Sequence, residues 1–136
     1  MPDVTPRLSE LPVIGTLPAE TLKDLERVGR LVRIPAGWSP VHELEPADKA
    51  YVVLVGQLEV TQGDSPIATI GPGSLAGEMG LVDHRLRNAR LVAVHPVTVL
   101  AWPRADFQRL RHAHQDFDLL VRHTTQERHV QNDITP

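Results

Sequence analysis

The central part of the chain is a series of short apolar or alternating stretches, separated by glycine and proline. Ala50–Val55 is continuously apolar, which predicts a strand buried on both faces. Gln57–Gln62 alternates, with Leu58 and Val60 on the inward side. Short strands with this many turn residues, twelve prolines and nine glycines, predict a β-sandwich or a jelly-roll barrel. Further strands are expected at Leu31–Ile34, Pro66–Ile70, Ala89–Val94 and Val97–Trp102.

One long segment, from residue 71 to residue 93, interrupts this series of strands. Exposed amides of a glycine-rich turn favour an anion, and an arginine can hold phosphate oxygens with two donors at once. A carboxylate nearby can accept a hydrogen bond from a sugar hydroxyl. We therefore interpret the segment as a pocket for a small phosphate ester with a ribose-like part. The residues concerned are Gly71, Gly73, Gly77, Glu78, Arg85, Arg87 and Arg90.

Within this segment, Gly77-Glu78, eight intervening residues and Arg87-Asn88-Ala89 resemble the phosphate-binding cassette of cyclic nucleotide-binding domains. In that family the glutamate holds the ribose 2′-hydroxyl and the arginine pairs with the cyclic phosphate. The resemblance implies that cAMP or cGMP is the ligand and that no other cofactor is needed. It implies ligand contacts from Gly77, Glu78, Met79, Arg87, Asn88 and Ala89.

The cassette differs from the usual family pattern at four positions. Ala76 stands where an aromatic residue is common, Leu86 where a proline is common, and Arg90 where a small hydroxyl residue is common. At a fourth position, Asn88 is a bulkier amide where a small polar residue commonly follows the arginine. The two charged contact residues are both present, so binding of a cyclic nucleotide is still expected. The differences at the other positions leave the choice between cAMP and cGMP open.

Helical patterns flank the strands, so the expected fold is mainly β with flanking helices. Its centre is a jelly-roll β-roll (a double-stranded β-helix). Before it, Leu22, Leu25 and Val28 recur at helical spacing after Pro18, with Gly29 as a stop. After it, a helix begins at Pro103, and a second runs from Asp116 to about Gln131 with Phe117 and Leu120 toward the barrel.

The chain is long enough for a single domain with its own core. Residues 1–16 are expected to form a loose N-terminal segment, broken by prolines, from which Leu8, Leu11, Val13 and Ile14 can dock. Residues 17–131 are expected to form one cyclic nucleotide-binding-like domain. Its β-roll spans about 31–102 and its C-terminal helices about 103–131.

The resemblance also implies a way of signalling. In the family the last helix closes over the pocket, and in many members it pairs with its twin in a dimer. The candidates for contact with the base are Thr124, Thr125, Gln131 and Asn132. The output is expected to pass through a homodimer or through a separate effector protein, unless the chain is a fragment of a longer protein.

Composition argues against several other classes of protein. A formal charge of −3 does not fit a nucleic-acid-binding surface, and no apolar run reaches membrane-spanning length. The chain has no cysteine and no signal-peptide pattern at its start, which favours the cytoplasm.

No residue pattern indicates an enzyme or a metal site. The sequence contains no P-loop and no serine, histidine and acid arrangement suited to nucleophilic catalysis. His112 and His114 are two residues apart and point to different sides of a helix, and His42 and His95 do not form a strand pair. We therefore expect a ligand sensor. The alternatives are a dimerisation or interaction scaffold that has lost its ligand and, less favoured, a metal-dependent barrel enzyme.

Overall fold

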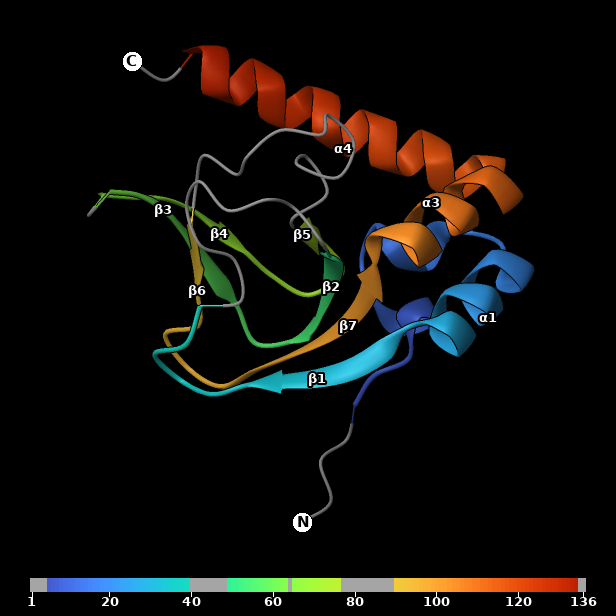
Figure 1. Ribbon diagram of the computed structural model, residues 1–136, viewed down its shortest axis with the longest axis horizontal. Helices are drawn as coiled ribbons and strands as arrows, with labels where there is room; N and C mark the ends of the chain where they lie inside the picture. The colour runs from blue at the N-terminus through green and yellow to red at the C-terminus, as the bar shows by residue number, and fades with distance from the viewer. Residues whose placement is uncertain (1–4, 40–48, 64, 77–89, 135–136) are drawn as a thin grey trace.

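The computed structural model describes residues 5–39, 49–63, 65–76 and 90–134. They form two antiparallel sheets with helices gathered at one side and a long C-terminal helix across one end (Figure 1). A fold that is mainly β with flanking helices is therefore confirmed. In chain order the elements are η1 (Leu8–Glu10), η2 (Ile14–Thr16), α1 (Ala19–Val28), β1 (Arg30–Ile34), β2 (Lys49–Val55), β3 (Leu58–Gln62), β4 (Ser65–Ile70), β5 (Leu75–Ala76), β6 (Arg90–Val92), β7 (Val97–Pro103), α3 (Arg104–Ala113) and α4 (Gln115–Ile134).

The strands divide into a four-stranded sheet A, in the order β1-β7-β2-β5, and a three-stranded sheet B, in the order β4-β3-β6. Strands β2 and β7 are central in sheet A and pair from Lys49↔Pro103 to Val55↔Thr98. All of Ala50–Leu54 is buried, as its continuous apolar run predicts, because both faces of this strand are covered. Strands β3 and β4 form the hairpin expected around Gly63.

Sheet A separates two hydrophobic cores. Toward the helices, Val52, Leu100 and Trp102 pack with Phe107 of α3 and Phe117 of α4. The ring centroids of Trp102 and Phe117 lie 6.2 Å apart, and those of Phe107 and Phe117 lie 5.8 Å apart, nearly perpendicular. Toward sheet B, the alternate residues of the same strands meet apolar side chains of β3, β4 and β6. The residues of this second core include Tyr51, Val53, Leu58, Ile70, Leu91, Val97 and Val99.

The N-terminal segment is docked on the first core through its two short 3-10 turns. Leu8, Leu11 and Ile14 are buried there, whereas Val13 remains exposed. Helix α1 is held to sheet A by a buried hydrogen bond, in which the indole Nε1 of Trp102 donates to the carbonyl of Leu25 at 3.0 Å. The N-terminal residues thus belong to the same core as the helices that follow the roll.

The observed elements differ from the sequence-based ones at one short strand and at several ends. Strand β6 ends at Val92, before the expected end at Val94. Strand β5 was not expected, because two residues are too short to show a period of two. Helix α4 continues to Ile134, past the predicted end near Gln131. The bounds of helix ends are the least certain feature of a sequence pattern.

Gly73 precedes β5 in a left-handed backbone conformation, with φ of 88°, and an added Cβ would overlap the carbonyl oxygen of Pro12. Gly37 has nearly the same φ, 86°, but no described residue lies within 4 Å of its missing Cβ. Among the described residues, the two glycines therefore share a φ and differ in crowding.

We predict that Gly37→Ala lowers the free energy of unfolding by about 1–2 kcal/mol, the cost of a left-handed alanine. Gly73→Ala should lower it by about 1–3 kcal/mol more, because the N-terminal segment must also shift. Urea unfolding of both variants measures the difference. Equal losses of unfolding free energy would contradict a steric clash between Pro12 and a side chain at position 73.

Candidate functional site

The predicted ligand contacts lie in a part of the chain that the structure does not describe. This applies to all six residues of the cassette prediction and to Arg85. Their roles stay predictions, and the strands on either side of the cassette give the structural context. The six residues are Gly77, Glu78, Met79, Arg87, Asn88 and Ala89.

The cassette connects the edges of the two sheets. Strand β5, at one edge of sheet A, ends at Ala76, which is fully buried and pairs with Tyr51 of β2. Strand β6, at one edge of sheet B, begins at Arg90, which pairs with Thr61 of β3. Both ends of the segment that carries Glu78 and Arg87 are thus held by strand pairing.

Strand β5 touches both cores with its two residues. Leu75 belongs to the core beneath the helices, and Ala76 belongs to the core between the sheets. Successive side chains of a strand point to opposite faces, so even this short strand reaches both. The residues that lead into the cassette therefore contact the core on which α3 and α4 are packed.

Two buried polar atoms lie where the chain re-enters the roll after the cassette. The Nε of Arg90 and the Oγ1 of Thr61 are shielded from solvent, and neither has a hydrogen-bond partner within the described ranges. Buried polar atoms are nearly always hydrogen-bonded, so such a pair on facing strands marks a place where a further polar group fits. Sequence reasoning placed Arg90 in the basic segment but did not identify Thr61.

The candidates for contact with the base lie on helix α4 and differ in the hydrogen bonds of their side chains. Thr124 Oγ1 donates to the carbonyl of Leu120 at 2.9 Å, one turn back in the same helix. Thr125 is buried, with 5% of its surface exposed, and its hydroxyl has no hydrogen-bond partner in the part of the chain described. The side chains of Gln131 and Asn132 lie outside the described residues. Thr125 is therefore the candidate with an unused hydroxyl.

The junction of α3 and α4 is held by a half-buried ion pair. Arg111 Nε lies 2.6 Å from Asp118 Oδ1, and Arg122 Nε lies 2.8 Å from Asp118 Oδ2. Partial burial acts to raise the pKa of Asp118, but the hydrogen bonds from Arg111 and Arg122 outweigh it and hold the pKa below its ordinary value. Asp118 therefore supports the junction above about pH 4, and this support is lost as the pH falls through the lowered pKa.

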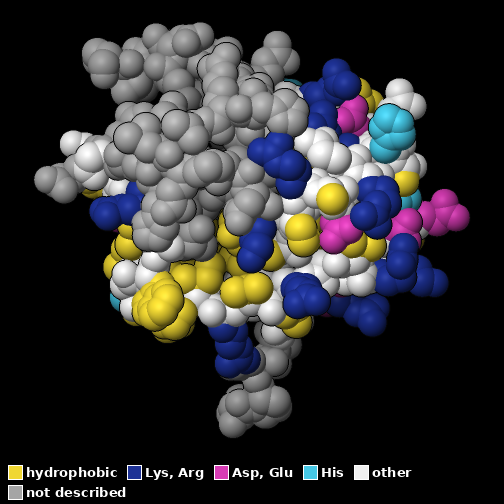
Figure 2. All heavy atoms as spheres, viewed as in Figure 1, with side chains coloured by type: hydrophobic (Ala, Val, Ile, Leu, Met, Phe, Trp, Pro, Cys, Tyr) yellow, Lys and Arg dark blue, Asp and Glu magenta, His cyan; other side chains and the backbone are white. Residues whose placement is uncertain are grey.

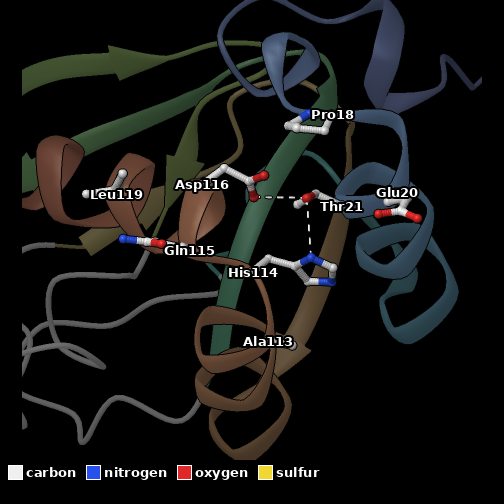
Figure 3. Close-up of a pocket in the computed structure, with 8 residues that line it drawn as sticks. All are labelled: Pro18, Glu20, Thr21, Ala113, His114, Gln115, Asp116 and Leu119. Atoms are coloured by element: carbon white, nitrogen blue, oxygen red, sulfur yellow. Dashed lines mark hydrogen bonds between the residues drawn. The ribbon is translucent and has the colours of Figure 1, made fainter.

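A depression of about 600 Å³ opens on the surface where α1 meets the start of α4 (Figure 3). Inside it, Thr21 of α1 faces His114 and Asp116, and dashed lines join the three side chains. Sequence reasoning weighed His114 only as a metal ligand, because its partners on α1 are about 90 residues away in the chain. The lining residues are Pro18, Glu20, Thr21, Ala113, His114, Gln115, Asp116 and Leu119, none of which belongs to β5 or β6.

A family model described as the cyclic nucleotide-binding domain matches residues 31–114, more than half of the chain. The chain belongs to the family of cyclic nucleotide-binding domains, and its predicted resemblance to this family is confirmed.

Two of the curated relatives illustrate the similarity to parts of larger proteins. A cyclic nucleotide-gated potassium channel of Mesorhizobium japonicum is 30% identical over 121 residues, which cover 89% of this chain and 34% of the channel. A cAMP-dependent protein kinase regulatory subunit of Aspergillus fumigatus is 31% identical over 106 residues, which cover 76% of this chain and 25% of that protein. The chain thus spans about a third or less of the length of these relatives.

Solved structures share the fold. One described as Sp-2Cl-cAMPS bound to PKAR CBD2 superimposes with a TM-score of 0.79 at 20% identity and covers 93% of this chain and 86% of its own. The N-terminal domain of a transcriptional regulator from Streptomyces coelicolor A3(2) superimposes with a TM-score of 0.71 at 25% identity and covers 96% and 98%. These likenesses confirm the jelly-roll architecture. Within the described residues, no helix is both long and apolar enough to cross a membrane.

Proposed function

We propose that this chain binds cAMP or cGMP and reports occupancy through its C-terminal helix. Glu78 accepts from the ribose 2′-hydroxyl and Arg87 pairs with the cyclic phosphate, while Gly77, Met79, Asn88 and Ala89 line the pocket. The observation that carries this proposal is the placement of the cassette. In a chain of this family, the segment that bears both charges begins at a buried strand of sheet A and ends at a strand of sheet B.

The unused polar atoms support a ligand at this end of the roll. The buried Nε of Arg90 suits an anionic oxygen, and the buried hydroxyl of Thr61 can donate to one or accept from a bridging water. We propose that these two groups lie at the edge of the phosphate pocket. Arg90 would then supply positive charge where the family usually has a small hydroxyl residue.

The reporting step follows from the core beneath the helices. Leu75, next to the cassette, lies in the same core cluster as Phe117 and Val121 of α4. Because packed cores favour discrete arrangements, a ligand that shifts β5 can favour one placement of α4 over another. We propose that Thr125 of α4 contacts the base and that helix movement converts binding into signal.

The partners of the module are proposed from the same helix. We propose that α4 pairs with its twin in a homodimer or binds a separate effector protein in the cytoplasm, and that the chain acts by binding and not by catalysis. Neither the membrane nor nucleic acid is a proposed partner. The two relatives described above match this chain within a longer channel protein and a longer kinase regulatory subunit, which is compatible with such an effector.

A scaffold that has lost its ligand is the second candidate, and surface apolar residues favour it. Leu31, Trp38 and Val94 are each more than half exposed, and Figure 2 shows apolar side chains gathered on one part of the face in view. Exposed apolar groups of this kind are common at protein contacts. Titration calorimetry with cAMP and cGMP separates the two candidates, since a scaffold binds neither.

We predict that Arg87→Ala weakens binding of the preferred cyclic nucleotide about 10- to 100-fold, because a charge-assisted hydrogen bond to phosphate is lost. Titration calorimetry measures the affinity. Arg85→Ala is the matched control, since it removes the same charge two residues away, and it should change the affinity by less than about threefold. Equal losses in the two variants would show only a general effect of charge, and the assignment of Arg87 would be wrong.

We predict that Thr125→Val weakens ligand binding about five- to tenfold, the loss of one hydrogen bond, while leaving the stability of the free protein unchanged or higher. The free protein should tolerate valine because the Thr125 hydroxyl makes no bond there that the structure describes. Calorimetry and urea unfolding give the two values. Thr124→Val is the control and should bind normally. Unchanged affinity in Thr125→Val would exclude contact with the base.

A further inference from the structure

The junction of α1, α3 and α4 contains a polar network that the proposed function does not use. His114 is the one residue between the last residue of α3 and the first residue of α4. Its Nε2 lies 2.8 Å from Oδ2 of Asp24, and its Nδ1 lies 3.3 Å from Oγ1 of Thr21, both on α1. Thr21 Oγ1 in turn donates to Oδ1 of Asp116 on α4 at 2.9 Å (Figure 3). We call these four residues the junction network.

The protons in this network can be counted. A hydroxyl has one proton, and Thr21 gives its proton to Asp116, because an ionised carboxylate only accepts. Nδ1 of His114 must therefore carry a proton of its own in order to bond Thr21 Oγ1. Nε2 must carry a second proton in order to bond the carboxylate of Asp24. A neutral imidazole has only one ring proton, so the junction network is complete only when His114 is an imidazolium.

We propose that His114 is a proton-operated clasp between α1 and the α3–α4 junction. When His114 is cationic, α1 is bonded to His114 at two points and to Asp116 at a third. When the imidazole loses one proton, one bond of the Thr21 hydroxyl or of the ring must break. The attachment of α4 to the rest of the helical layer therefore depends on pH.

Charged groups of both signs lie around His114. Asp24 of α1 contacts the ring, Asp116 of α4 is bonded to Thr21, and Glu20 of α1 lines the same depression. The nearby cations are already paired, since Arg27 lies 3.3 Å from Asp24 and Arg111 lies 2.6 Å from Asp118. The imidazole itself is largely shielded, with 16% of its side chain exposed. Two carboxylates thus take part in the junction network, and Asp24 is shared between His114 and Arg27, whereas Arg111 is held outside the network by Asp118.

The network has an acid limit as well as an alkaline one. The hydrogen bond from His114 holds the pKa of Asp24 below its ordinary value, and Arg27 adds to this. Asp24 therefore contributes to stability above about pH 4, and this contribution is lost as the pH falls through the lowered pKa. At the other end, the network loses a hydrogen bond when the His114 ring gives up one of its two protons. The clasp is complete only between these two limits.

The test compares the pH dependence of thermal unfolding in four proteins without any ligand, from about pH 5.5 to about pH 8. The Tm of the wild type should fall by about 3 °C more over this range than that of His114→Gln, since one hydrogen bond is lost. His112→Gln removes an exposed histidine two residues away and should follow the wild type. A His114→Gln variant that keeps the wild-type dependence on pH would overturn the clasp.

Asp116→Asn provides a sharper variant. An asparagine amide can donate to Thr21 Oγ1, which frees the Thr21 hydroxyl to donate to Nδ1, so a neutral His114 then satisfies every bond. As the pH rises, the Tm of this variant should therefore fall no more than that of His114→Gln, although the variant retains His114. A wild-type dependence on pH in Asp116→Asn would contradict the proton count.

The imidazole nitrogen signals of the wild type give a readout that needs no variant to fold. In proton–nitrogen correlation spectra, both ring nitrogens of His114 should carry protons where the Tm is highest. One proton should be lost over the pH range in which the Tm falls. A fall in Tm without this change in the ring would assign the effect to another group. Because no ligand is present, failure here leaves the proposed binding function untouched.

Discussion

The structure depends on the burial of sheet A on both of its faces. Strands β2 and β7 send alternate side chains to two cores, with Val52 and Leu100 toward the helices and Val53 and Val99 toward sheet B. Burial of this much apolar surface is the main favourable term in the folding of such a domain. The same sheet therefore fixes both the helical layer and the strand that leads into the cassette, and these two parts cannot be packed independently of each other.

This double burial explains how a binding segment and a reporting helix can be coupled. Ala76 contacts the core between the sheets and Leu75 contacts the core beneath α3 and α4, so β5 lies in both. The junction network joins α1 to His114 and α4 within the helical layer. A ligand would act on α4 through β5, and protonation would act on it through α1. In these two proposals, the inputs would meet at the same helix from different directions.

The sequence predicted the strands and helices that have a clear period. The apolar run of β2 and the helical spacing of Leu22, Leu25 and Val28 each identified an element that the structure contains. Strand β5 has too few residues for a period, and the docking of Leu8 and Ile14 depends on a core assembled from distant parts of the chain. The cassette was recognised because its residues are close in sequence. The pairing of Arg90 with Thr61 and the contacts of His114 with α1 depend on tertiary folding, which local patterns do not encode.

The central claim is that Glu78 and Arg87 bind a sugar and a phosphate of one ligand between the edges of two sheets. Titration calorimetry of the wild type and Glu78→Ala, with the preferred cyclic nucleotide and its 2′-deoxy analogue, tests it most directly. The wild type should bind the deoxy compound about tenfold more weakly than the parent nucleotide. The variant should bind both alike, because the hydrogen bond between Glu78 and the 2′-hydroxyl is already absent from it. Equal binding of the two compounds by the wild type, or discrimination that survives in Glu78→Ala, would contradict the account.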